Sequence, residues 1–247
     1  MSDLTAELNT ETKEELIKRY QEIEEKIITA ADRADRDIEK IKLVAVGKTH
    51  PLSRMLFLKE QLTDSKISLT AFGESRVQEL LAKEEEFPGK INWHFIGHLQ
   101  RNKVKYLARL ENVTLIHSLD SLRLAREINK RAKKNDRVME TLLQVNIAED
   151  ENKYGFMQDE VKEFLQQAEE FSHLKIKGLM TILPHFAEQE KTRPYFQKMK
   201  ELQAELTAAG FKLPELSMGM TNDYEIAIEE GATILRVGRA LFGPRDY

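Results

Sequence analysis

The chain of 247 residues carries 42 Asp and Glu against 38 Lys and Arg, a net charge of −4, and it contains no Cys. Hydrophobic residues make up 41% of it, enough to build a large core without covalent cross-links, so disordered and disulfide-rich classes of protein are excluded. The lack of Cys excludes thiol catalysis and Cys-ligated zinc, and the acidic balance argues against a general binder of nucleic acid or membrane surfaces.

The first residues are acidic and polar and lack the basic and apolar regions of a signal peptide. No run approaches the roughly 18 apolar residues that span a bilayer. We therefore expect a cytoplasmic protein without a membrane anchor.

Apolar residues at helical spacing predict an amphipathic helix over about 11–40. A short apolar run at 41–47 then ends in glycine and leads into a helical stretch to about Gln61, which predicts one strand and one helix. This unit is followed by seven more strands, each leading into a helix or, at the end, into the C-terminal segment. The further strands are predicted at 69–72, 91–96, 113–117, 141–145, 176–182, 215–218 and 233–237, and the helices at 76–86, 100–110, 122–134, 158–170, 188–209 and 223–230.

Strands that alternate with helices favour parallel pairing, and apolar strands bounded by turns favour burial on both faces. Eight such units in about 200 residues suit a closed (β/α)₈ barrel, with a doubly wound open sheet as the alternative. The sequence has no linker rich in Pro, Gly or Ser. We therefore expect one α/β domain over residues 1–247, a TIM barrel with an extra N-terminal helix.

In such barrels the functional groups follow the strands, and phosphate commonly binds at the loops after the seventh and eighth strands. The loop after the seventh predicted strand offers Ser217 and Thr221 around a glycine, and the loop after the eighth contains Arg236, Gly238 and Arg239. Taken alone, the loop with Ser217 and Thr221 is more typical of a capped turn. Together, at the two expected places, they predict a phosphate-binding cup.

Lys48 follows the first predicted strand. A lysine there is ordinarily solvated, but one that faces a phosphate cup can form a Schiff base with an aldehyde cofactor. Pyridoxal phosphate (PLP) is the cofactor that joins an aldehyde to a phosphate. Lys153, after the fifth predicted strand, is either a surface lysine or a second amine near the same rim.

Two other motifs point elsewhere but lack their context. Gly47-Lys48-Thr49 resembles the end of a P-loop, but Lys42 stands where that motif needs glycine. His94 and His98 have a metal-ligand spacing only on a helix, whereas this segment is predicted to be a strand. We therefore expect packed or hydrogen-bonded histidines and no metal site.

With these residues assembled, the sequence resembles the pyridoxal phosphate homeostasis protein family, also called the YggS or PROSC family. The resemblance runs from about Leu43 to Tyr247. The segments that carry it are 45–49 (Ala-Val-Gly-Lys-Thr), 72–79, 93–103 (beginning Trp-His-Phe-Ile-Gly-His), 178–181 (Gly-Leu-Met-Thr), 216–223 and 236–242.

The resemblance implies the barrel shared with the N-terminal domain of alanine racemase, a type III PLP fold. It implies that Lys48 holds PLP as an internal aldimine. Phosphate contacts are implied for Ser217, Thr221, Gly238 and Arg239, and Arg236 is placed at the pyridine nitrogen. A guanidinium there opposes protonation of the ring, which makes the ring a poorer electron sink.

The sequence departs from the family pattern at two points. Gly47 stands where the family usually has Ser, and Ser75-Arg76 stands where it has Asn-Tyr, of which the Asn typically lies near the cofactor. Both departures change the polarity beside the expected site.

We expect a monomeric protein that binds PLP, buffers it and delivers it to apo PLP-dependent enzymes, with little or no catalysis of its own. One alternative is a PLP-dependent racemase or lyase, although a racemase needs a second domain and only ten residues follow Val237. Another is a barrel enzyme for a phosphorylated metabolite that uses Lys48 as a Schiff-base lysine.

Overall fold

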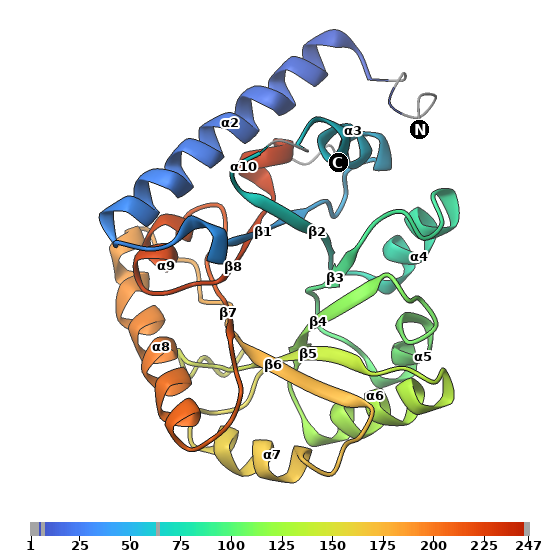
Figure 1. The fold of residues 1–247 in the computed structure, drawn as a ribbon, viewed down its shortest axis with the longest axis vertical. Helices are drawn as coiled ribbons and strands as arrows, with labels where there is room; N and C mark the ends of the chain where they lie inside the picture. Colours follow the sequence, from blue (N-terminus) through green and yellow to red (C-terminus); the bar gives the residue numbers. More distant parts are fainter. Residues whose placement is uncertain (1–4, 6–7, 63–64, 245–247) are drawn as a thin grey trace.

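Eight parallel strands form a closed barrel in which each strand pairs with the next and β8 pairs with β1 (Figure 1). The computed structural model describes residue 5 and residues 8–62 and 65–244. The closed barrel confirms the predicted (β/α)₈ architecture over an open sheet. The strands are β1 (Lys42–Val46), β2 (Ser68–Glu74), β3 (Trp93–Phe95), β4 (Val113–Leu119), β5 (Met139–Gln144), β6 (Leu174–Met180), β7 (Glu215–Ser217) and β8 (Ile234–Val237).

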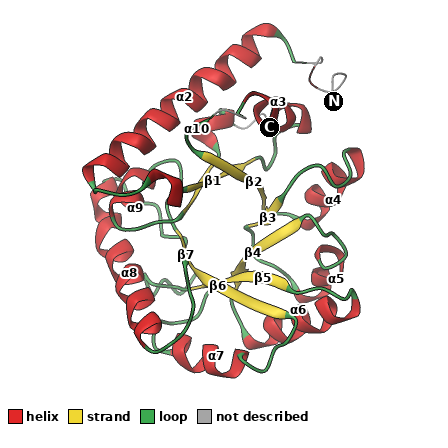
Figure 2. Cartoon of the chain, in the orientation of Figure 1, coloured by secondary structure: helices red, strands yellow, loops and turns green. Residues whose placement is uncertain are grey.

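Helices surround the strands on the outside of the barrel (Figure 2). They are α3 (Leu52–Gln61), α4 (Val77–Glu86), α5 (Val104–Leu107), α6 (Leu122–Lys134), α7 (Glu160–Ala168), α8 (Arg193–Ala208), α9 (Tyr224–Glu229) and α10 (Arg239–Phe242). Among the described residues, no helix combines the length and the apolar character needed to cross a membrane.

Two of the predicted helices begin as 3₁₀ turns. The helix expected at 100–110 consists of η2 (Arg101–Lys103) and the single turn α5, after which the amides of Arg109 and Leu110 bond three residues back and close the helix. The helix expected at 188–209 begins with η3 (Gln189–Thr192) before α8.

The first described helix, α2 (Thr10–Arg33), is amphipathic as predicted, but it ends seven residues before the expected boundary at about residue 40. Asn9 caps its first turn by accepting a hydrogen bond from the amide of Thr12. Asp35 has a φ of 51°, which breaks the helix, and a short 3₁₀ turn η1 (Ile38–Lys40) leads into β1. The apolar stripe of α2 is buried; it comprises Leu16, Tyr20, Ile23, Ile27, Ala30 and Ala31.

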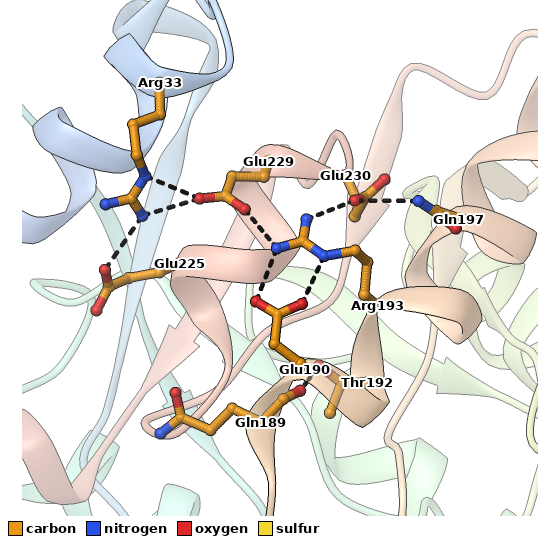
Figure 3. Close-up of polar contacts among 9 residues, drawn as sticks. All are labelled: Arg33, Gln189, Glu190, Thr192, Arg193, Gln197, Glu225, Glu229 and Glu230. Atoms are coloured by element: carbon orange, nitrogen blue, oxygen red, sulfur yellow. Dashed lines mark hydrogen bonds and ion pairs between the residues drawn. The ribbon is translucent and has the colours of Figure 1, made fainter.

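Ion pairs tie α2 to the last part of the barrel (Figure 3). Arg33, at the end of α2, pairs with Glu225 at 3.4 Å and with Glu229 at 2.8 Å, both on α9. On α8, Arg193 pairs with Glu229 at 2.8 Å and with Glu230 at 2.7 Å. Glu229, on α9, therefore links α2 to α8.

The barrel interior has two layers of different character. The lower layer is aliphatic, as is usual in these barrels. It consists of Val44, Leu115, Leu142, Met180 and Ile234. Two residues further along β4 and β8 stand His117 and Arg236, both buried. A polar layer thus lies between the aliphatic core and the carboxyl ends of the strands.

Candidate functional site

A cavity of about 680 Å³ opens at the carboxyl ends of the strands. Five of the six predicted site residues lie on its wall, brought together from β8 and from the loops after β1, β7 and β8. They are Lys48, Thr221, Arg236, Gly238 and Arg239. The sixth, Ser217, is on β7 and is fully buried, with its side chain bonded within the polar layer.

The backbone on both sides of Lys48 is held in place. The amide of Gly47 donates to the carbonyl of Gly73 on β2, and the Gly47 carbonyl accepts from the ammonium of Lys83 at 2.8 Å. On the other side, the amide of Thr49 donates to the carboxylate of Glu79, and Thr49 has a φ of 67°, in the left-handed region. A half-buried lysine is therefore presented to the cavity from a fixed turn.

Behind this turn lies a cluster of one ammonium and two carboxylates, in which Lys83 and Glu74 are buried and Glu79 is half-buried. Lys83 bonds to the carboxylate of Glu74 and to that of Glu79, at 3.1 Å for Glu79. Burial raises the pKa of Glu74 to about 7, against the opposing attraction of Lys83. Glu74 Oε2 is buried and has no hydrogen-bond partner in the part of the chain that is described.

The loops after β7 and β8 form a cup of backbone amides. Asp223 Oδ1 accepts from the Met220 amide at 2.6 Å and fixes the first loop. Four amides around the cavity donate to no protein acceptor within the described residues. They belong to Thr221, Asn222, Gly238 and Arg239. Unpaired amides on adjacent loops are the donors that bind a phosphate group.

Two glycines allow these loops to approach so closely. Gly219 has a φ of 87°, and a Cβ there would lie 2.6 Å from the Cβ of Ala227. At Gly238 a Cβ would lie 3.2 Å from the carbonyl oxygen of Val46 on β1. The backbone of the second loop therefore packs against β1, next to the Lys48 turn.

Arg236 is the cation of the polar layer and reaches the cavity wall. Its guanidinium donates to Ser217 Oγ at 2.6 Å and to the carbonyl oxygen of Thr181 at 2.8 Å. Burial lowers the pKa of Arg236 to about 10, and the nearby carboxylate of Asp223 opposes this shift. At neutral pH the side chain is therefore a protonated cation that is held by neutral acceptors.

A chain of hydrogen bonds continues from Arg236 into the barrel. Ser217 Oγ lies 3.0 Å from His117 Nδ1, and His117 Nε2 lies 3.0 Å from His94 Nδ1. Burial lowers the pKa of His94 to about 4 and lowers that of His117 as well, so both rings are neutral at neutral pH. Because Arg236 can only donate, the Ser217 proton is left for His117, whose own proton then lies on Nε2.

His94 and His98, four residues apart in the sequence, face different partners. His94 points into the barrel towards His117, whereas His98 Nδ1 lies 3.0 Å from Asp120 and its ring stacks on Tyr154. Among the described residues, no group of three or more His, Asp or Glu is placed to hold a metal ion. Lys153, next to Tyr154, is exposed and lies on the cavity wall.

The supporting residues Lys83 and His117 carry no recognisable signal in the sequence, because a lysine on an amphipathic helix and a histidine in a strand are ordinary in isolation. At Gly47, the first departure, a Cβ would lie 2.6 Å from Cε at the flexible end of the Met55 side chain, so a larger residue there requires Met55 to move. Ser75, at the second departure, lies on the cavity wall, and the neighbouring Arg76 is exposed.

Comparison with known proteins assigns this arrangement to a family. Residues 20–246 match the model of the alanine racemase N-terminal domain. A pyridoxal phosphate homeostasis protein of Aquifex aeolicus is 44% identical over 232 residues, which cover 93% of this chain and 98% of that protein. The chain belongs to the pyridoxal phosphate homeostasis proteins. A second member, from Escherichia coli, is 34% identical over 92% of this chain and 95% of its own length.

A solved structure of the same family shows a bound cofactor. PipY of Synechococcus elongatus, with PLP bound, has a TM-score of 0.74 to this chain at 32% identity, over 90% of this chain and 100% of PipY. The cavity of this chain has the groups needed to bind PLP. A lysine on the wall suits the aldehyde, and four unpaired amides in two glycine-containing loops suit the phosphate.

Proposed function

We propose that this protein binds PLP reversibly through a Schiff base at Lys48, stores it in the cavity and delivers it to apo PLP-dependent enzymes. The observation that carries the proposal is the convergence, in one cavity, of Lys48 with the unpaired amides of Thr221, Asn222, Gly238 and Arg239. We further propose that the protein acts in the cytoplasm as a monomer.

Each group of the cofactor has a complement in this chain. Lys48 would hold the aldehyde, and the Thr221 hydroxyl with the amides of Gly238 and Arg239 would hold the phosphate. Hydrogen bonds to a charged phosphate contribute roughly 1.5–3 kcal/mol each, so the phosphate supplies much of the affinity. Arg236 would lie at the ring, as the family resemblance implies.

The surroundings of Arg236 favour storage over turnover. PLP bound to an amine supplies an electron sink for bonds at the amino-acid α-carbon, and this sink is strongest when the ring nitrogen is protonated. The Arg236 guanidinium bonds to Ser217 and to the Thr181 carbonyl, stays protonated at neutral pH and would oppose a proton on the ring nitrogen.

Borohydride trapping tests the covalent part of the proposal. Reduction of the PLP-loaded protein should fix one pyridoxyl group on Lys48, located by peptide mass mapping. Lys48→Ala should still bind PLP through the cup, but more weakly. It should lack the absorbance band, in the near-ultraviolet to visible range, of the Schiff base between Lys48 and PLP. A label found only on Lys153 or on another lysine contradicts the assignment.

A transfer assay with a turnover control tests the functional part. Loaded protein mixed with an apo aminotransferase should lose its absorbance band as the aminotransferase gains activity. Turnover of any common amino acid at about 1 per second or faster, a modest rate for an enzyme, would contradict storage and support the racemase or lyase alternative.

A further inference from the structure

Positive charge is concentrated in one part of this acidic chain. Residues 101–134 contain ten Lys and Arg against three Asp and Glu, a net charge of +7. The whole chain carries −4, so the remaining residues carry −11. An asymmetry of this size creates a local positive potential on an otherwise negative protein.

The charge lines a groove between η2 and α6. The groove measures about 910 Å³, and four cations lie on its wall. We call it the basic groove and define it by Arg101, Arg123, Arg126 and Lys130. The last three are spaced three and four residues apart on α6, which places them along one face of the helix.

The two acidic side chains in the groove wall do not neutralise these cations. Asp120 Oδ2 lies 3.0 Å from His98 Nδ1, and Glu127 Oε1 accepts from Arg131 at 2.6 Å. The four cations of the basic groove are exposed and, within the described residues, form no ion pair with any carboxylate. Their charge is therefore available to a partner.

The basic groove adjoins the mouth of the cofactor cavity. His98, on the groove wall, stacks on Tyr154 with ring centroids 3.8 Å apart. Tyr154 is 57% exposed, and its neighbour Lys153 lies on the cavity wall. The exposed ring of Tyr154 thus lies between the groove and the cavity, where it can pack against a bound partner.

We propose that the basic groove docks an acidic surface of the apo enzyme that receives PLP. The proposal rests on the delivery function proposed above. A compact acidic patch on a protein can contact the four cations beside the cavity without leaving the groove. A long nucleic acid would extend beyond the groove, over residues with a net charge of −11, which repel it.

Docking at this place favours transfer because it holds the recipient's lysine near the cavity. One amine replaces another at the aldehyde carbon. The bond to Lys48 Nζ breaks as the bond to the recipient's lysine forms, and two protons of the incoming amine pass to Lys48 Nζ. No oxidant or reductant is needed. The negative charge elsewhere on the chain repels an acidic recipient and so orients it towards the groove.

The test compares two triple variants with the same change in net charge. The groove variant is Arg101→Glu/Arg126→Glu/Lys130→Glu, and the control is Lys18→Glu/Lys26→Glu/Lys162→Glu, at exposed helical positions outside the groove. The second-order rate of PLP transfer to an apo aminotransferase of acidic isoelectric point is measured in 20 mM and in 500 mM salt. At low salt we expect the groove variant to lose about tenfold or more and the control to transfer at nearly the native rate. At high salt the three proteins should converge.

Complex formation with the same apo aminotransferase, measured by calorimetry, separates docking from delivery. Salt-sensitive binding that is lost only in the groove variant supports the inference even if transfer fails, in which case the delivery function is wrong. Equal losses in both variants, or transfer that is insensitive to salt and to the groove, overturns the inference. A 20-nucleotide RNA that binds native protein but not the groove variant, with transfer unchanged, would reassign the groove to nucleic acid.

Discussion

The ammonium of Lys83 lies 2.8 Å from the carbonyl oxygen of Gly47, the residue before Lys48. Lys83 is on α4 and Gly47 follows β1, so this hydrogen bond fixes the Lys48 turn to a helix on the outside of the barrel. The same ammonium pairs with the buried Glu74. The position of Lys48 therefore depends on an ion pair that lies outside the cavity.

Removal of Lys83 should destabilise the protein strongly. Lys83→Met leaves Glu74 buried without its cation, and the loss of one partner of a buried pair costs about 3–5 kcal/mol. Urea unfolding measures the free energy of unfolding. Lys162→Met on the exposed face of α7 is the control and should change it by about 0.5 kcal/mol or less. A loss in Lys83→Met no larger than in this control would contradict a structural role for the pair.

Acidification should lower stability through His94 and His117. In the unfolded chain both have a pKa near 6.5, whereas burial lowers the pKa of His94 to about 4 and that of His117 also. Between these values the unfolded chain binds more protons, so the free energy of unfolding decreases as the pH falls, by up to about 1.4 kcal/mol per pH unit for each group.

Glu74 acts in the opposite direction, because its raised pKa of about 7 makes the folded state bind more protons between the model value of 4.5 and 7. Two histidines outweigh one carboxyl group where the windows overlap. Urea unfolding between pH 4.5 and 7.5 should therefore show a decrease at low pH that His117→Gln reduces. An unchanged pH profile in this variant would show that folding does not lower the pKa of His117.

Substitution of Gly238 should weaken PLP binding in proportion to side-chain size. A Cβ there lies 3.2 Å from the Val46 carbonyl oxygen, so Gly238→Ala requires a small shift and Gly238→Val a larger one that displaces the cup amides. Fluorescence titration should give a dissociation constant for PLP that rises from native protein to Ala to Val. Pyridoxal, which lacks the phosphate, should respond much less.

The ratio of PLP to pyridoxal affinity separates the roles of Ser217 and Thr221. The Ser217 hydroxyl lies between Arg236 and His117, whereas Thr221 lies on the cavity wall. Thr221→Ala should therefore lower the ratio, and Ser217→Ala should leave it nearly unchanged while lowering stability by about 1–3 kcal/mol. A ratio that falls equally in Ser217→Ala would assign its hydroxyl to the phosphate, as the family resemblance implies.

The sequence predicts the barrel well because local patterns determine it. Each strand is a short apolar run that ends in a turn, and the order of strands follows from alternation with helices. Helix ends are predicted less well. The end of α2 at Arg33 depends on the left-handed backbone of Asp35, and the shortness of α5 depends on 3₁₀ bonds, neither of which changes the apolar pattern.

The candidate site is predicted only where the fold places residues at strand ends. Lys48 and the two cup loops are found in this way. Lys83 and His117 act through contacts with residues that are 36 and 100 positions away, with the Gly47 carbonyl and with Ser217. No local spacing encodes such contacts, so these residues become visible only in three dimensions.

The position of α2 affects the order in which a new chain can fold. Its helical partners are α3, α9 and α10, and its ion pairs reach α9, whose residues are about 190 positions later in the chain. During synthesis on the ribosome, α2 emerges long before its partners α9 and α10. Its apolar stripe, with Leu16, Tyr20 and Ile23, must remain exposed or be covered by a chaperone until those two helices have emerged. A helix that is made early is thus among the last to dock.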